Sequence, residues 1–187
     1  MFPLQTVDFP IGGEIRTRDV LCVQTPATLK TFLDLDIRTR TEAMKIDREN
    51  KRVYVKNLLT GQNEWIAYDK LMLAPGASPR IPDVPGVHNE KILTLRNLAD
   101  MGRIMSVAQS SKKVVVVGAG FIGLEMAEQL HRKELSVELV QYESRVLPQL
   151  GEKMAKLLES ELEGHGIGLH LNERVVRFEN RESAIIC

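Results

Sequence analysis

Residues 114–125 read Val-Val-Val-Val-Gly-Ala-Gly-Phe-Ile-Gly-Leu-Glu, and this stretch decides how the second half of the chain folds. Four β-branched residues in a row are typical of a strand that is buried on both faces. Gly118, Gly120 and Gly123 follow at the G-x-G-x-x-G spacing, and a helical pattern begins directly after them. Such glycines permit a tight turn, let a pyrophosphate approach bare backbone at a helix N-terminus, and let the helix pack closely on the strand. The stretch therefore predicts a dinucleotide-binding site.

The pattern on either side of this stretch predicts an α/β domain with a parallel sheet. Segments with the hydrophobic pattern of a strand alternate along the chain with segments that have the pattern of a helix. This alternation is the signature of successive βαβ units. Asn97 can cap a preceding helix over residues 97–109. We expect strands at 113–117, 137–141 and 167–171, helices at 121–133 and 152–163, and the start of a meander at 175–178 and 184–186.

The first half of the chain predicts a different arrangement. A short helix over residues 19–36 has Thr25 as its cap and Pro26 in its first turn, with Leu29, Phe32 and Leu33 on one face. Three alternating segments then predict an antiparallel meander. Its strands cover residues 37–46, 51–58 and 63–67, and a more continuously apolar fourth strand covers 69–74 around residues 71–73.

Composition excludes several classes of protein. The 187 residues carry 25 basic and 25 acidic side chains, so no basic field attracts nucleic acid or anionic lipid, and we expect neither partner. Cys22 and Cys187 lie far apart, which excludes a disulfide framework and a cysteine-based zinc site and suits the reducing cytoplasm. The four histidines are scattered along the chain, so we expect no metal site.

Several ordered blocks of sequence carry a resemblance to a known family. Across residues 9–180 the chain resembles the pyridine nucleotide–disulfide oxidoreductase flavoproteins, in the branch of coenzyme A-disulfide reductase, NADH oxidase and NADH peroxidase. The blocks are Ile11-Gly12-Gly13-Glu14-Ile15, Gln24-Thr25-Pro26, the run from Tyr68 to Ala77, Pro85-Gly86, Thr94-Leu95-Arg96-Asn97, the run from Gly118 to Glu125, and Arg145-Val146-Leu147-Pro148.

The resemblance implies two nested nucleotide domains, a partial FAD-binding domain over residues 1–90 and a C-terminally incomplete NAD(P)H-binding, three-layer Rossmann-like domain over 91–187. It implies that Phe121 is an aromatic lid over the flavin and that Glu125 lies close to the nicotinamide. From the residues alone, Phe121 could equally pack in the core, and Glu125 could simply complement the helix dipole. The implied NAD(P)H contacts are Gly118, Gly120, Phe121, Ile122, Gly123, Glu125, Gln141, Glu143 and Arg145, and the implied FAD contacts are Ala43, Ala74, Pro75, Gly76 and Ala77.

The choice between NADH and NADPH depends on the end of the second parallel strand. An acidic residue there normally binds the ribose 2′-hydroxyl and selects NAD. Gln141 occupies that position, Glu143 follows two residues later, and Arg145 could accept a 2′-phosphate or remain a solvated surface residue. An amide can bond a hydroxyl but does not repel a phosphate as a carboxylate does. We expect NADH to be favoured.

The chain also departs from the family pattern. The branch keeps a redox cysteine shortly before the Ile-Gly-Gly block, near Gln5, and residues 1–9 contain none; Cys22 is expected to be a small core residue instead. No strand-glycine-helix fingerprint precedes Ile11, and the family's second FAD segment and dimerisation domain are not found. We therefore expect an internal part of the family pattern, without a catalytic nucleophile and unable to catalyse the family reaction unaided.

These observations predict a function and leave alternatives. The complete form would be an FAD-dependent oxidoreductase that passes hydride from NAD(P)H to FAD and then to a disulfide, a persulfide, oxygen or peroxide. The alternatives are a catalytically incompetent NAD-binding fragment and a reductase of the ferredoxin or rubredoxin type, which needs no active cysteine. Apolar strands at 71–73 and 114–117 would leave faces and edges open, so we expect self-association into a homo-oligomer, or a missing segment supplied by another chain. The substrate is expected to be a small molecule.

Overall fold

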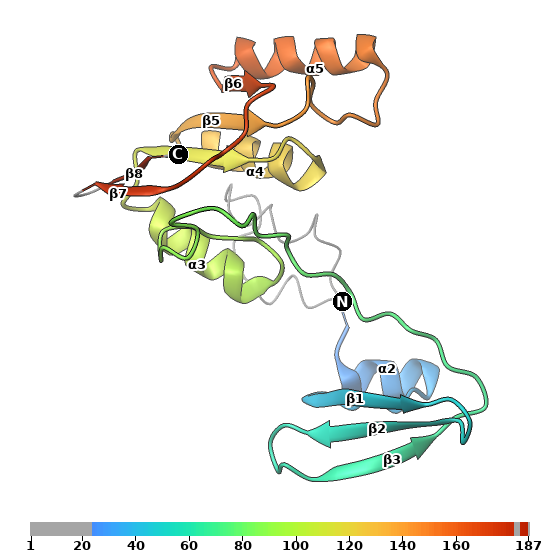
Figure 1. The fold of residues 1–187 in the computed structure, drawn as a ribbon. Helices are drawn as coiled ribbons and strands as arrows, with labels where there is room; N and C mark the ends of the chain where they lie inside the picture. Colours follow the sequence, from blue (N-terminus) through green and yellow to red (C-terminus); the bar gives the residue numbers. More distant parts are fainter. Residues whose placement is uncertain (1–23, 182–183, 187) are drawn as a thin grey trace. The chain divides into compact units, whose positions relative to one another are not determined.

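The computed structural model describes residues 24–181 and 184–186 (Figure 1). These residues divide into two compact units, residues 24–76 and the residues from 77 onward, and each unit is described by itself. The predictions made for Gln5, for the block that begins at Ile11, and for Cys22 and Cys187 lie outside the described residues.

A parallel sheet forms the centre of the unit that begins at residue 77. Its strands are β4 (Lys113–Val117), β5 (Ser136–Gln141) and β6 (Gly168–Leu171), in the order β4-β5-β6. The register places Val116 beside Leu139 and Leu139 beside Leu169. Helices α4 (Phe121–His131) and α5 (Glu152–Gly164) connect the strands. The predicted βαβαβ run is confirmed, and each element ends within two residues of its predicted bounds.

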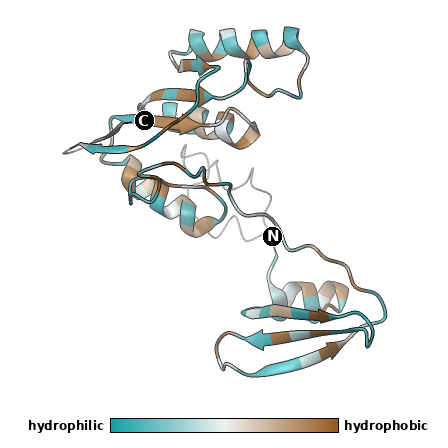
Figure 2. Cartoon of the chain, in the orientation of Figure 1, coloured by the Kyte–Doolittle hydropathy of each residue, from teal (hydrophilic) through white to brown (hydrophobic). Residues whose placement is uncertain are grey.

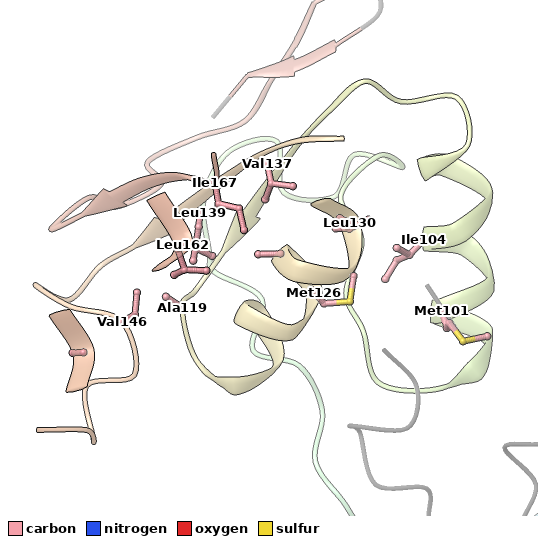
Figure 3. Packing of buried hydrophobic residues seen from close by; sticks show 12 residues of the cluster. Met101, Ile104, Ala119, Met126, Leu130, Val137, Leu139, Val146, Leu162 and Ile167 are labelled. Carbon is pink, nitrogen blue, oxygen red and sulfur yellow. The ribbon is translucent and has the colours of Figure 1, made fainter. Parts of the chain in front are cut away.

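The core of this unit lies between the helices and one face of the sheet. Alternate strand residues point into it, and Val137 and Leu139 of β5 are almost completely buried. Met126 and Leu130 of α4 pack against the core, as Figure 3 shows. Helix α3 (Leu98–Ala108) contributes Met101 and Ile104 to the same cluster, whose burial provides the main stabilisation of the unit.

The opposite face of the sheet is more open and carries a row of charged residues across three strands. Val115 and Val117 are 37% and 52% exposed on this face. The Glu138 carboxylate accepts a hydrogen bond from Lys113 Nζ at 2.9 Å, and its second oxygen lies 2.8 Å from His170 Nε2. The hydrogen bonds from Lys113 and then from His170 lower the pKa of Glu138 despite its partial burial.

Helix α3 begins with a reciprocal cap. Asn97 Oδ1 accepts from the backbone N–H groups of Ala99 and Asp100 at 2.8 and 3.1 Å, and Asp100 Oδ2 accepts from Asn97 N at 3.1 Å. Burial alone would raise the pKa of Asp100, but hydrogen bonds from Arg103 and from the backbone of Arg96 and Asn97 outweigh it, and the pKa is lowered. The predicted Asn97 cap is confirmed.

Replacing Asn97 with alanine is expected to cost about 1 kcal/mol of unfolding free energy, because it leaves two N–H groups of the first turn without a partner. Chemical denaturation of the wild type and of Asn97→Ala measures the difference. Asn97→Asp keeps the acceptor and is the matched control, expected to stay within about 0.5 kcal/mol of the wild type. Equal losses in both variants would contradict a capping role.

The unit of residues 24–76 is an antiparallel meander with one short helix. Its strands β1 (Thr41–Asp47), β2 (Arg52–Asn57) and β3 (Asn63–Ala67) pair in sequence order, as predicted. The Tyr54 and Trp65 rings lie 4.9 Å apart, and the Arg52 guanidinium stacks over Trp65 at 4.3 Å. In Figure 2 this sheet mixes hydrophobic and hydrophilic residues, whereas the four valines of β4 form a continuous hydrophobic strand.

Helix α2 (Pro26–Leu33) is shorter than predicted. Thr25 caps it by accepting from Thr28 N, and Pro26 stands in the first turn, as the sequence indicated. Asp34 adopts a left-handed conformation with φ of +51°, which ends the helix before the predicted residue 36. Phe32 and Leu33 are 78% and 62% exposed, so the apolar face of α2 is not buried within the described residues.

The carboxylate of Asp47 organises the β1–β2 turn. It accepts from the Asn50 side chain and backbone at 2.9 and 3.1 Å and from Arg52 Nε at 2.9 Å. These bonds, the Asn50 side chain first, lower the pKa of Asp47 from 3.8 to about 2.

Because the folded pKa of Asp47 lies below the unfolded one, its stabilising contribution is complete above pH 3.8 and is lost as the pH falls toward about 2. An NMR titration of the carboxyl carbon is expected to give a midpoint near 2 in the wild type. Asn50→Ala removes the side-chain donor and should move the midpoint toward 3.8. A wild-type midpoint at 3.8 would contradict the turn geometry.

Two predicted strands are wrong. Residues 71–73 form no strand, and Leu71, Met72 and Leu73 are 39%, 91% and 66% exposed, because no strand of the described chain pairs with their backbone. Residues 175–178 are also irregular, since the N–H of Phe178 donates to the Pro85 carbonyl at 2.8 Å instead of to a neighbouring strand. The antiparallel pair starts later, with β7 (Glu179–Arg181) against β8 (Ala184–Ile186).

Across the described parts of the chain, no helix is long and apolar enough to cross a bilayer.

Candidate functional site

The turn between β4 and α4 has the geometry that its glycines predict. Gly118 has φ of +102°, a conformation that residues with a side chain rarely adopt, and its N–H donates to Val140 O at 2.8 Å. A Cβ atom on Gly123 would overlap the Gly118 carbonyl oxygen, so this position allows α4 to approach β4. The first and third glycines are thus required by the fold itself.

Gly120 serves a different purpose, because a Cβ atom placed on it would meet no atom within 4 Å. It is the N-cap residue of α4, its φ of −79° is available to any residue, and it makes no side-chain cap hydrogen bond. The first N–H groups of a helix have no intrahelical acceptor. Bare backbone therefore faces open space at the positive end of α4, an arrangement suited to a phosphate group.

Ala119, between the first two glycines, links the turn to the segment after β5. It is fully buried, and its N–H donates to Gln141 Oε1 at 3.0 Å. Its carbonyl accepts from Leu147 N at 2.9 Å, and Leu147 itself has φ of +40°. Val146 N donates to Glu159 Oε1 of α5 at 3.0 Å, so residues 146 and 147 are held on one side by the glycine turn and on the other by α5.

The two site side chains that follow the turn are not accounted for by packing or hydrogen bonding within the described residues. Phe121 is 59% exposed and Ile122 is 36% exposed, which rules out core packing as the role of Phe121 in the described chain. Glu125, one turn further, has a buried Oε2 atom with no hydrogen-bond partner among the described residues. A buried carboxylate oxygen without a donor is costly, so it is expected to meet a donor from a ligand or another segment.

The residues predicted to read the ribose lie at the carboxyl end of β5. Gln141 is buried, whereas Glu143 is exposed and its carbonyl accepts from Asn172 N at 3.0 Å. Arg145 is partly buried. Together with Ser144, it lines a polar pocket against α5 whose other residues are Glu152, Ala155, Lys156 and Glu159.

Four of the residues implied to contact FAD lie in the unit of residues 24–76 and are exposed, and the fifth, Ala77, begins the other unit. Ala43 lies in β1 where the register with β2 shifts between Ala43 and Lys45, which marks a bulge. Ala74, Pro75 and Gly76 are exposed and irregular, and Gly76 has φ of +75°. Ala77 is likewise exposed. None of these five positions lines the pocket around Val87 and Arg103 or the pocket around Arg145.

Three residues of the site were not predicted from the sequence, namely Ala119, Leu147 and Glu159. Ala119 acts through its backbone, which any residue carries, and Glu159 is one of several acidic residues on α5. The loop itself was indicated by the Arg145-Val146-Leu147-Pro148 block and by Glu143, but not these hydrogen bonds. No group of three or more potential metal ligands occurs in the described part of the chain.

The chain matches the family model described as pyridine nucleotide-disulphide oxidoreductase over residues 13–186. It is 34% identical over 169 residues to an NADH oxidase from Enterococcus faecalis, and 32% identical over 168 residues to a coenzyme A disulfide reductase from Staphylococcus haemolyticus. These matches cover 90% and 89% of this chain and 38% of each relative.

Among solved structures, the water-forming NADH oxidase from Lactobacillus brevis bound to NADH superposes with a TM-score of 0.90 at 26% identity. The match covers 98% of this chain and 41% of the oxidase chain. The chain thus spans well under half the length of the proteins it resembles. The family model matches most of the residues of this chain, and the structure contains the glycine turn that the resemblance predicts. The chain belongs to the pyridine nucleotide-disulphide oxidoreductase family.

Proposed function

We propose that the chain is the nicotinamide-nucleotide-binding part of an FAD-dependent NAD(P)H oxidoreductase. One observation carries the proposal above the others: the glycine turn presents bare backbone N–H groups and open space at the N-terminus of α4. These groups would hold the pyrophosphate of NAD(P)H without a charged side chain. When bound, the nicotinamide supplies a hydride to the reaction.

The chain's own residues have separate roles in this proposal. Gly118 makes the turn, Gly120 leaves room for the phosphates, and Gly123 sets the helix against the strand. Phe121 is exposed at the helix start and can shield the reacting face from water. Glu125 has an unpaired buried oxygen that can accept a hydrogen bond from the nicotinamide carboxamide and so orient the ring.

The electron acceptor of the whole protein would be a small molecule, namely a disulfide, a persulfide or oxygen. Similarity to an NADH oxidase and to a coenzyme A disulfide reductase supports both kinds of acceptor. The sequence contains no cysteine in residues 1–9, so a disulfide or persulfide acceptor would need a nucleophile from another position.

The protein is proposed to be a cytoplasmic homo-oligomer. Val115 and Val117 are exposed on one face of the parallel sheet, and no strand of the described chain pairs with the outer edge of β4. Open edges and apolar faces favour association. The two widely separated cysteines support a reducing compartment.

Titration with NADH under anaerobic conditions tests the function. The expected result is saturable binding, with bleaching of the flavin absorbance if the purified protein carries flavin. Colourless protein that still binds NADH would support the alternative of a nucleotide-binding module without redox activity. Protein that binds neither NADH nor NADPH would overturn the proposal.

A further inference from the structure

The orientation of the Gln141 amide is fixed by its partner. Ala119 N–H is a donor, so the atom that faces it at 3.0 Å must be the acceptor Oε1 and not Nε2. Both residues are buried, and leaving the Ala119 N–H without an acceptor would cost about 1–3 kcal/mol. Gln141 is therefore held in one of the two orientations that an amide could take.

The fixed orientation leaves one group of Gln141 for a ligand, and that group is a donor. Nε2 makes no hydrogen bond within the described chain, yet it is not among the buried polar atoms without a partner, so it is open to solvent. Gln141 is the last residue of β5, the position from which this type of fold reads the ribose 2′-substituent. A carboxylate there would present an acceptor with a negative charge, and this chain presents a neutral N–H₂.

We propose that Gln141 makes the nucleotide site accept NADH and NADPH with comparable affinity. A ribose 2′-hydroxyl both donates and accepts, whereas a 2′-phosphate only accepts, and an N–H₂ donor satisfies either. The inference rests on the proposed function, because it concerns the same nucleotide, and it replaces the sequence-based expectation that NADH is favoured.

One cation on the connection that follows Gln141 is available to a phosphate. Arg145 and the Ser144 hydroxyl line a pocket against α5 together with Lys156 and two carboxylates. Lys156 pairs with Glu152 at 2.6 Å and Glu159 accepts from Val146 N, which leaves Arg145 as the cation that can meet a phosphate. The exposed Glu143 is the neighbouring carboxylate that would oppose a phosphate, which is why we expect comparable affinities and not a preference for NADPH.

Equilibrium binding of NADH and NADPH to the full chain, followed by nucleotide fluorescence or calorimetry, tests the proposal. For the wild type, the two dissociation constants are expected to lie within about tenfold of each other. Gln141→Glu keeps an acceptor for Ala119 N–H but exposes a carboxylate oxygen. It should raise the ratio of the NADPH to the NADH constant by about 10-fold to 100-fold, as expected for losing a hydrogen bond to a charged group.

Gln149→Glu is the matched control, because it adds the same charge on an exposed residue of the same connection. It should change the ratio by less than about threefold, since exposed charges are screened. Wild-type protein that binds NADH at least 100-fold more tightly than NADPH would overturn the inference and leave the proposed function standing. An unchanged ratio in Gln141→Glu would also overturn it. If the wild type binds neither NADH nor NADPH, the proposed function and this inference are both overturned.

Discussion

Gly123→Ala is expected to destabilise the protein by about 3 kcal/mol or more, because the new methyl group would overlap the Gly118 carbonyl oxygen. The clash is with backbone, which cannot rotate away as a flexible side chain would. Helix α4 would have to move off β4 and disturb Met126 and Leu130 in the core. Nucleotide binding should be lost with the packing, since the first turn of α4 would be displaced.

Chemical denaturation followed by circular dichroism measures this effect. Gly102→Ala is the matched control, because Gly102 is an exposed residue in the interior of α3 where a Cβ atom meets nothing within 4 Å. The control should stabilise the protein by about 0.5–1 kcal/mol through the higher helix propensity of alanine. A Gly123→Ala protein as stable as the wild type would show that α4 does not pack on β4 as described.

Gly120→Ala is expected to have the opposite profile, with normal folding and weak nucleotide binding. A Cβ atom at Gly120 meets no protein atom, and its φ of −79° suits alanine. The methyl group would instead occupy the space through which the pyrophosphate approaches the backbone. A misfit of about 1–3 kcal/mol weakens NADH binding by roughly 5-fold to 150-fold.

Calorimetric titration with NADH, together with a thermal melt, separates the two effects of Gly120→Ala. The melting temperature should stay within a few degrees of the wild type while the dissociation constant rises. Together, the two variants would show that Gly123 is needed for the fold and that Gly120 is needed for nucleotide binding. Unaltered NADH affinity in Gly120→Ala would place the nucleotide elsewhere.

The parallel sheet could be predicted from sequence because its signals are local. Val114 to Val117 and the glycines that follow determine a strand, a turn and a helix within a few residues. The same kind of local signal gave a wrong prediction at residues 71–73, where three consecutive apolar residues resemble a buried strand. Strand formation requires partners for the backbone, and the described chain supplies none to Met72, which is 91% exposed.

The candidate site was predictable only in part, for the same reason. The glycines predict a nucleotide-binding site. The hydrogen bond from Ala119 to Gln141 could not be predicted, because it joins residues 22 positions apart and its donor is a backbone N–H that every residue except proline has. The sequence placed Gln141 at the ribose position without showing which end of its amide would face outward. That orientation follows from tertiary structure alone, and the proposal that both nucleotides bind rests on it.

The proposed function depends most directly on where the nucleotide phosphates bind. An NMR titration of ¹⁵N-labelled protein with NADH measures this without requiring catalysis. The largest amide shifts are predicted at Gly120, Phe121 and Ile122, the first N–H groups of α4. Saturable binding with its largest shifts at the pocket around Val87 and Arg103 would contradict the proposed function.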